Sequence, residues 1–174
     1  MNTLFRKQLM GGASATAALA FVVLAWVSLP QFRSQVPLPT DETAARLAFA
    51  VQWLLVPGWM LLAGVFGASR RGFYADAIEG TRTPAAHTLE INLRYNQNTI
   101  EQTILAAIAW TSLAVVLPHD ELILIPAMAV LFALGRITFW IGYVLHPMGR
   151  TFGMSLTVLP TIFAFLALTW MALT

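Results

Sequence analysis

The chain alternates long apolar segments with short polar ones. Five apolar segments follow one another, and only the fourth carries a charged residue: Gln8–Leu29, Leu47–Ser69, Gln102–Leu117, Leu122–Leu145 and Thr151–Thr174. About 20 apolar residues cross a bilayer as a helix. The third segment reaches this length when the polar stretch before it, which begins near His87–Asn92, joins the same helix. The pattern predicts an all-α integral membrane protein with five transmembrane helices.

Prolines and polar residues predict where these helices bend and begin. Pro57–Gly58 lies near the middle of the second segment and predicts a kink, which neighbouring helices can cover. Pro160 is the corresponding position in the fifth segment. Thr40 is a candidate N-cap for the second helix, with Asp41 and Glu42 in its first turn.

The first segment has two interpretations. Arg6–Lys7 before an apolar run is typical of a secretory signal. However, the run is long for a signal, and Val27–Pro30 is a poor cleavage site. These features favour a helix that stays in the membrane.

Composition excludes several classes of function. The 174 residues are 58% hydrophobic and 10% charged, whereas soluble domains carry about 25% charged residues. The net charge is only +2 and no basic run occurs, so we expect no nucleic-acid partner. Cysteine is absent, so any thiol must come with a substrate. The three histidines lie far apart, without the spacing of metal ligands, so no metal is expected.

Positive charges predict the orientation in the membrane. With the N-terminus inside, the inner segments carry Arg6, Lys7, Arg70, Arg71, Arg82 and Arg150. The outer segments then carry only Arg33 and Arg46. The prediction is a cytoplasmic N-terminus and a C-terminus on the opposite side. The inner ends would also bring several arginines together as a cationic pocket.

A polar stripe opens the third helix. Arg94, Asn98 and Glu101 are spaced i, i+4 and i+7, so they share one helix face. Charged residues inside a membrane helix are expensive and therefore indicate function. The alternative is that Arg94 and Glu101 only hold neighbouring helices together through buried pairs.

A second series begins with the single charge of the fourth segment. Arg136 lies near mid-membrane and needs a partner inside the bundle, for which Glu101 is the natural candidate. A structural ion pair is at least as good an interpretation as a ligand contact. Tyr143 and Arg150 follow at intervals of seven residues. Alone, Tyr143 could be an interfacial anchor and Arg150 an ordinary inner-side charge.

Three sequence patterns resemble the MAPEG family, the membrane-associated proteins in eicosanoid and glutathione metabolism. They are Ser69–Phe73, with its arginine pair, then Arg94-x3-Asn98-x2-Glu101, and finally Arg136-x6-Tyr143-x6-Arg150. Their order and intervals resemble the family over residues 44–173. The chain is thus similar to a bacterial-type member with an added N-terminal helix.

The resemblance implies an up-down bundle of four transmembrane helices in residues 44–174. Residues 1–43 would form the extra transmembrane helix and its linker. It further implies a homotrimer in the bacterial inner membrane, with glutathione as cosubstrate and a lipophilic electrophile or hydroperoxide arriving from the membrane lipid. By resemblance, Arg150 stabilises the thiolate. The residues that would hold glutathione are Arg70, Arg94, Asn98, Glu101, Arg136 and Tyr143.

Two departures from the family keep other functions open. The first helix is additional, and Gln102 and Phe139 stand where some glutathione-using members carry tyrosines. The leading hypothesis is a glutathione transferase or peroxidase. The alternative is a non-catalytic membrane scaffold or regulator with the same fold. A small transporter is a weaker hypothesis, because the sequence shows no inverted repeat.

Overall fold

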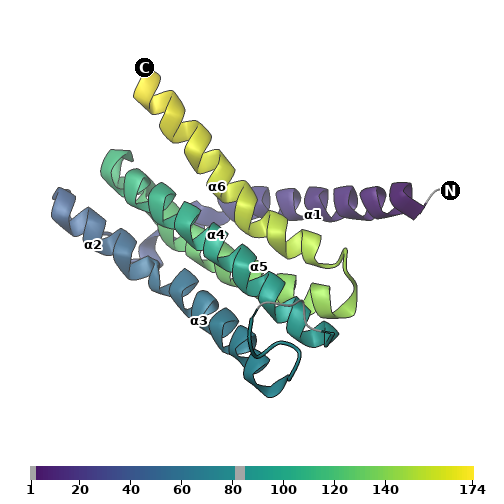
Figure 1. Cartoon of the computed structure of the whole chain (residues 1–174). Coiled ribbons are helices and arrows are strands. Elements are labelled where there is room, and N and C mark those ends of the chain that lie inside the picture. The colour runs from purple at the N-terminus through teal and green to yellow at the C-terminus, as the bar shows by residue number, and fades with distance from the viewer. Residues whose placement is uncertain (1–2, 81–84) are drawn as a thin grey trace.

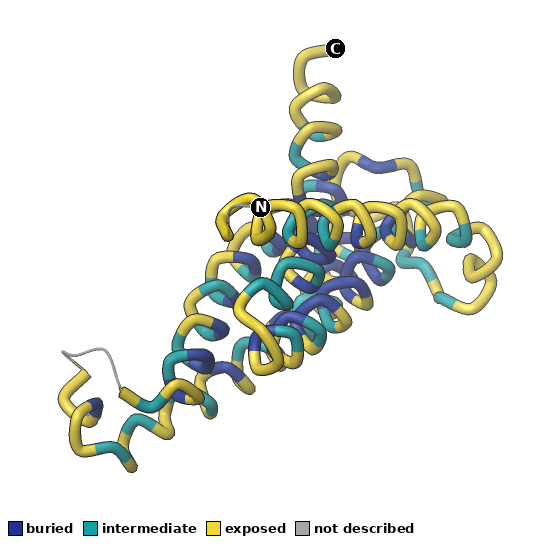
Figure 2. Tube along the Cα trace, turned by 90° about the vertical axis from the view of Figure 1, so that its right-hand side faces the viewer, coloured by how far each residue is buried: buried dark blue, intermediate teal, exposed yellow. Residues whose placement is uncertain are grey.

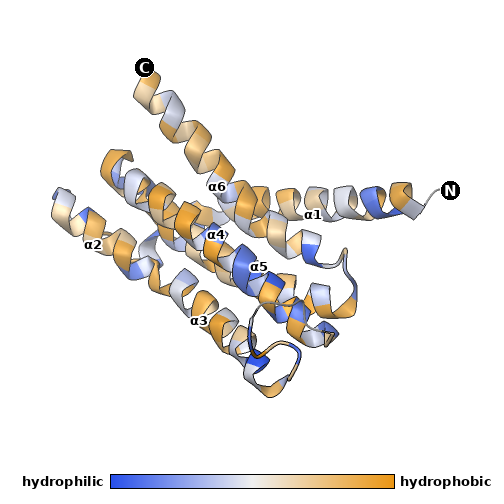
Figure 3. Cartoon of the chain, in the orientation of Figure 1, coloured by the Kyte–Doolittle hydropathy of each residue, from blue (hydrophilic) through white to orange (hydrophobic). Residues whose placement is uncertain are grey.

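The computed structural model describes residues 3–80 and 85–174, and this part of the chain is helical without strands. Within these residues, five segments are long and apolar enough to span a membrane, as predicted. Figures 1 and 3 show these helices and their hydropathy. The helices are α1 (Thr3–Phe32), α2 (Thr43–Trp53), α3 (Leu55–Ser69), α4 (His87–Val116), α5 (Leu124–Leu145) and α6 (Arg150–Leu173). Short 3-10 turns are η1 (Arg33–Gln35), η2 (Arg70–Phe73) and η3 (His119–Ile123).

The second span is broken where proline requires it. α2 ends at Trp53 and α3 begins at Leu55, two residues before Pro57. Proline has no N–H and its ring clashes with the preceding turn, so the helix is interrupted at Leu54. The helical hydrogen-bond pattern resumes at Gly58, whose N–H donates to the Leu54 carbonyl at 3.0 Å. The interruption therefore lies three residues before Pro57, close to where the sequence predicts a kink.

Two helix ends differ from the prediction. α1 continues past Pro30 to Phe32 and tightens into η1, because a proline near the last turn removes little of the ladder. Thr40 does not cap α2, whose N-cap position is Glu42 without a side-chain hydrogen bond. Asp41 instead accepts a hydrogen bond from Arg46 at 2.9 Å.

α4 is the central helix and packs against α2, α3, α5 and α6. Its Ala106, Ala109 and Trp110 are buried in the main apolar core. Trp110 meets Phe132 of α5 edge-on, with ring centroids 6.3 Å apart. Figure 2 shows the buried residues concentrated along this central part of the bundle.

A glycine seam joins α5 to α6 and consists of Gly135, Gly142, Gly149 and Gly153. A Cβ atom added at Gly153 would overlap the backbone of Phe139, and one at Gly142 would overlap the backbone of Gly149. Small residues allow helix backbones to approach closely in membranes. The seam therefore fixes α6 directly against α5.

α1 lies across α5 and α6 (Figure 1). Ala18 and Val22 pack with Leu131 and Leu156 in a separate small core. Gly11 approaches Met148 in the α5–α6 turn. The beginning of α1 and the end of α6 project from the bundle and are exposed along their length (Figure 2).

The bundle has two ends of different character. The cationic end gathers η2, the start of α4, the end of α5 and the start of α6 (Figure 1). The opposite end gathers η1, the start of α2, the end of α4 and η3, and it is held by ion pairs. There Arg33 pairs with Asp120 at 2.6 Å, and Arg46 pairs with Asp41. The hydrogen bond from Arg46 holds the pKa of Asp41 below its ordinary value, despite partial desolvation.

Candidate functional site

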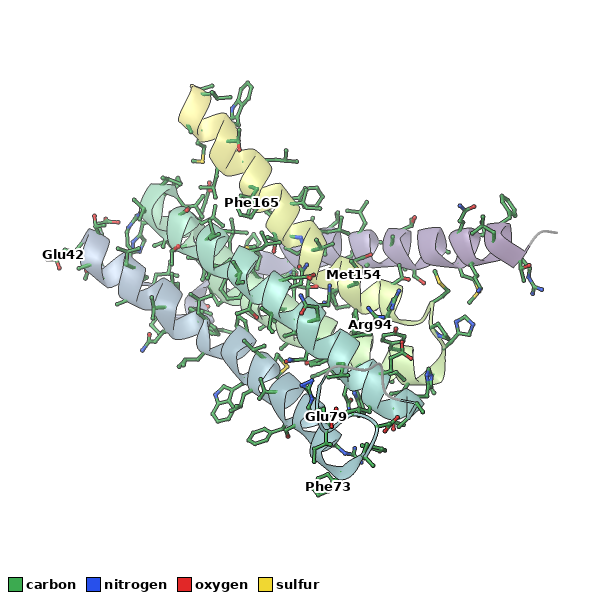
Figure 4. All side chains as sticks on the ribbon, viewed as in Figure 1. Glu42, Phe73, Glu79, Arg94, Met154 and Phe165 are labelled. Atoms are coloured by element: carbon green, nitrogen blue, oxygen red, sulfur yellow. The ribbon has the colours of Figure 1, made fainter. Side chains whose placement is uncertain are left out.

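The cationic end carries most of the predicted site residues. Arg70 belongs to η2, Arg94 lies about two turns into α4, Tyr143 is in the last turn of α5 and Arg150 is the first residue of α6. Figure 4 shows Arg94 near this end, while Glu42 lies at the far end of the bundle. The up-down order of the helices therefore brings these four residues, from distant parts of the sequence, to the same end of the molecule.

Arg150 stands over the ring of Tyr143, with its guanidinium carbon 4.6 Å from the ring centroid. A cation over an aromatic face is held by the ring quadrupole. Arg150 is half-buried and makes no ion pair with the described residues. Because it also begins α6, its charge adds to the positive end of the helix dipole. This position favours an anion.

Arg70 and Arg94 are both exposed. The Arg94 side chain is 64% exposed, and its Nε lies 3.9 Å from a Glu90 carboxylate oxygen, one turn earlier on α4. A surface pair at that distance contributes little. Arg70 makes no ion pair with the residues in 3–80 and 85–174. Both guanidinium groups are therefore available to an anionic ligand.

Arg136 is completely buried, with an exposed fraction of 0%. Its NH1 donates to Asn98 Oδ1 at 2.7 Å, and its NH2 donates to Thr157 Oγ1 at 2.6 Å. The guanidinium also stacks on Phe139 at 4.9 Å and on Phe132 at 5.7 Å. Arg136, Asn98 and Thr157, from α5, α4 and α6, are called the Arg136 network below.

The predicted partnership between Arg136 and Glu101 is wrong within this chain. Glu101 is exposed and accepts a hydrogen bond from Gln97 Nε2 at 2.9 Å. α4 is rotated so that Asn98, half-buried, reaches Arg136 while Glu101 faces outward. The predicted stripe thus follows the border between the core and the outer face. Arg94 and Glu101 are exposed on either side of Asn98.

The positions that depart from the family are enclosed. Phe139 is 2% exposed and contacts the rings of Tyr95 and Tyr143 edge-on, at centroid distances of 6.0 and 5.9 Å. Gln102 is 5% exposed, and its Oε1 has no hydrogen-bond partner among the described residues. The Phe139 ring thus contacts both the guanidinium group of Arg136 and the ring of Tyr143, over which Arg150 lies.

Three structural roles escaped the sequence analysis. Arg46 is buried and donates from NH1 to the Leu117 carbonyl at 2.8 Å, which satisfies the end of α4. Asn92 joins α3 to α5, because it donates to the Gly67 carbonyl and accepts from Trp140 Nε1. Thr157 anchors Arg136. The pairing of Arg46 could have been predicted from the sequence, because Asp41 stands five residues before it. No sequence pattern marks Asn92 or Thr157.

An open groove of about 320 Å³ lies away from these residues. It is lined by Val36, Pro37, Phe49, Gln52, Trp53 and Val56. These residues belong to the linker after α1 and to the α2–α3 break, so the groove belongs to the opposite half of the bundle. In residues 3–80 and 85–174, no three His, Asp or Glu side chains gather as metal ligands.

Comparison with known proteins identifies the relatives of this chain. The model of the MAPEG family matches residues 9–170. Transmembrane protein 79 of Mus musculus is 28% identical over 160 residues, which are 87% of this chain and 40% of that protein. The chain thus spans about two fifths of the length of this relative. No solved structure matches it significantly. Because the family model covers nearly the whole chain, and the chain is a bundle of membrane-length helices, the protein belongs to the MAPEG family.

Proposed function

We propose that the protein is a membrane-embedded, glutathione-dependent transferase or peroxidase. Its second substrate would be a lipophilic electrophile or hydroperoxide that enters from the bilayer. The observation that carries the proposal is Arg150, which has no ion-pair partner among the described residues and stands at the start of α6 over Tyr143. Family membership supports a role connected with glutathione.

The charges at the cationic end suit glutathione, which carries two carboxylates and one ammonium. Exposed Arg70 and Arg94 offer guanidinium groups to the carboxylates. Exposed Glu101 offers a carboxylate to the ammonium. Asn98 lies between Arg94 and Glu101 on the stripe and adds a neutral polar group. The ligand would therefore lie along the start of α4.

Arg150 would activate the thiol. A cation beside a sulfur atom stabilises the thiolate, and the thiolate is the nucleophile. In the transferase reaction, the sulfur forms a bond to an electrophilic carbon as that carbon's leaving group or π electrons depart. In the peroxidase reaction, two glutathione molecules are oxidised to their disulfide while the hydroperoxide is reduced to an alcohol and water. Tyr143 holds Arg150 in place in both reactions.

The test is a thiolate difference spectrum in detergent after glutathione is added. We expect a thiolate signal with the unaltered protein and its loss in Arg150→Ala. Arg33→Ala is the matched control, because Arg33 lies at the opposite end in an exposed pair. A signal that survives in Arg150→Ala would show that the assigned mechanism is wrong.

A non-catalytic scaffold or regulator is the second candidate. The enclosed positions of Phe139 and Gln102 favour it, because no tyrosine hydroxyl stands at either place. This alternative predicts no thiolate signal in any variant. It also predicts that Arg136 is needed for the fold while Arg150 is dispensable.

We further propose that the chain forms a homotrimer. The exposed face of α4 carries Ile104 and Ile108 beyond Glu101, and the exposed end of α6 projects from the bundle. A second copy could cover these surfaces and complete the ligand site beside Arg94. The native mass of the same detergent preparation tests the proposal.

The proposed location is the bacterial inner membrane, with the N-terminus in the cytoplasm. Arg6, Lys7 and the arginines of the cationic end would then face the cytoplasm, as the positive-inside rule requires. Arg82, which the prediction also assigned to this side, lies outside the described residues. The opposite end, where each of the two arginines pairs with an aspartate, would face outward.

A further inference from the structure

Arg136 cannot touch a ligand at the cationic end, because none of its surface is exposed. Its contacts are an amide oxygen, a hydroxyl and two aromatic rings, and no carboxylate pairs with it among the described residues. A buried charge without an acidic partner is costly, so its hydrogen bonds must be well formed. Any effect of Arg136 on a ligand must pass through a neighbour.

The contact with Asn98 fixes the direction of the Asn98 amide. A guanidinium group has five N–H donors and no acceptor. The Asn98 atom that lies 2.7 Å from Arg136 NH1 must therefore be Oδ1 rather than Nδ2. The Nδ2 group then points away from the guanidinium, and it makes no hydrogen bond with the described residues. Asn98 thus presents a donor on the stripe between Arg94 and Glu101.

Thr157 keeps the guanidinium in this position. Its Oγ1 accepts from Arg136 NH2 at 2.6 Å and donates to the Met154 carbonyl at 2.9 Å. The hydroxyl proton is committed to the helix, so the oxygen lone pairs are left for Arg136. The rings of Phe132 and Phe139 restrict the remaining movement. Helix α6 therefore sets the orientation of an amide on α4.

We propose that Arg136 is a positioning residue. Anchored by Thr157, it fixes the amide of Asn98 so that Nδ2 donates to a carboxylate or carbonyl oxygen of the ligand. The identity of that ligand as glutathione rests on the proposed function, whereas the orientation of Asn98 does not. Arg136 thereby affects ligand binding through Asn98 and does not contact the ligand itself. The family resemblance had implied a direct contact.

The binding test compares two matched threonines of α6. Thr157 and Thr161 are both buried, and each donates its hydroxyl proton to a carbonyl of its own helix. Of these two threonines, Thr157 accepts a hydrogen bond from Arg136, whereas Thr161 bonds only to the Thr157 carbonyl among the described residues. We expect Thr157→Val to raise the Kd of glutathione about tenfold, roughly the value of one hydrogen bond, and Thr161→Val to leave it unchanged. Equal Kd values for Thr157→Val and the unaltered protein would overturn the proposal.

Asn98→Asp separates positioning from folding. The carboxylate still accepts from Arg136, so the variant should remain folded and unfold at no lower temperature. It lacks the Nδ2 donor, so the Kd of glutathione should rise at least tenfold. An unchanged Kd would contradict the assigned orientation. Arg136→Gln, which can donate or accept, should weaken binding in the same direction.

A second measurement decides the proposal without glutathione. The side-chain amide resonances of Asn98 are recorded after selective 15N-asparagine labelling and are assigned by their loss in Asn98→Asp. They should shift or broaden in Thr157→Val but not in Thr161→Val. If the unaltered protein binds no glutathione, the proposed function fails, and these resonances still test Arg136. Unchanged resonances in Thr157→Val would refute the positioning role alone.

Discussion

At the residue scale, the two buried arginines show how this fold accommodates charge. Arg46 directs its guanidinium at the carbonyl oxygens of Ala114 and Leu117 and at Asp41. Arg136 uses an amide, a hydroxyl and two rings. The planar guanidinium group has several N–H donors in fixed directions, so it can donate to acceptors that lie apart from one another. The compact ammonium group of lysine cannot reach them all.

Replacing Arg46 should destabilise the protein strongly. Arg46→Met leaves the end of α4 with unsatisfied carbonyl groups in a buried place, at a cost of about 2 to 4 kcal/mol. Arg33→Met is the control, because its pair with Asp120 is largely exposed and should contribute less than about 1 kcal/mol. Denaturant unfolding in detergent measures both. Equal losses in the two variants would contradict the role assigned to Arg46.

The sequence predicted that the arginines of three helix ends lie at one end of the bundle, but it did not predict the partner of Arg136. Arg94, Asn98 and Arg136 were identified because charges and amides are rare in membrane helices, whereas Tyr143 and Arg150 were identified by their seven-residue spacing and the family resemblance. The partner of Arg136 depends on the rotation of α4 about its axis, and helix spacing alone does not determine that rotation. Thr157 was missed because threonine is common in membrane helices and commonly bonds its own backbone.

At the element scale, the glycine seam determines how closely α5 and α6 pack. Gly153→Ala should force the two backbones apart and lower the free energy of unfolding by about 1 to 3 kcal/mol. Gly12→Ala is the matched control, since nothing lies within 4 Å of its added Cβ and alanine favours the helix. Thermal unfolding in detergent compares the two variants. If Gly153→Ala and Gly12→Ala unfold at the same temperature, close packing at the glycine seam does not contribute to stability as proposed.

Helix existence and helix ends were predictable to different degrees. The five spans follow from apolar length alone, and the break before Pro57 follows from the missing N–H. The end of α1 and the start of α2 did not follow, because local signals competed with tertiary contacts. Asp41 would have favoured the first turn of α2, yet it pairs with Arg46 and also lies 3.3 Å from His119 Nδ1.

At the scale of the whole molecule, the two ends predict an orientation that can be measured. The chain has no cysteine, so a single introduced cysteine can be labelled without background reaction at other positions. Glu121→Cys, in η3, should react with a membrane-impermeant maleimide applied to intact cells. Glu79→Cys, in the exposed loop after η2, should react only after the membrane is permeabilised. The reverse pattern would show that the proposed orientation is wrong.

Helix order and family followed from the sequence, but the placement of α1 did not. Apolar segments of similar length carry no information about which faces meet. The division of the chain at residue 43 stays a prediction, and the family match begins within α1, at residue 9.

The position of α1 has a consequence for how the protein is made. α1 leaves the ribosome before α5 and α6, yet it packs on Leu131 of α5 and Leu156 of α6. Arg33, the first residue after α1, also pairs with Asp120, beyond α4. During synthesis, the face of α1 that later packs on α5 and α6 therefore stays in contact with lipid until these two helices have entered the bilayer. The packing of α1 is therefore completed only after α5 and α6 are in place, so a slow late step in biogenesis would leave α1 exposed to quality control.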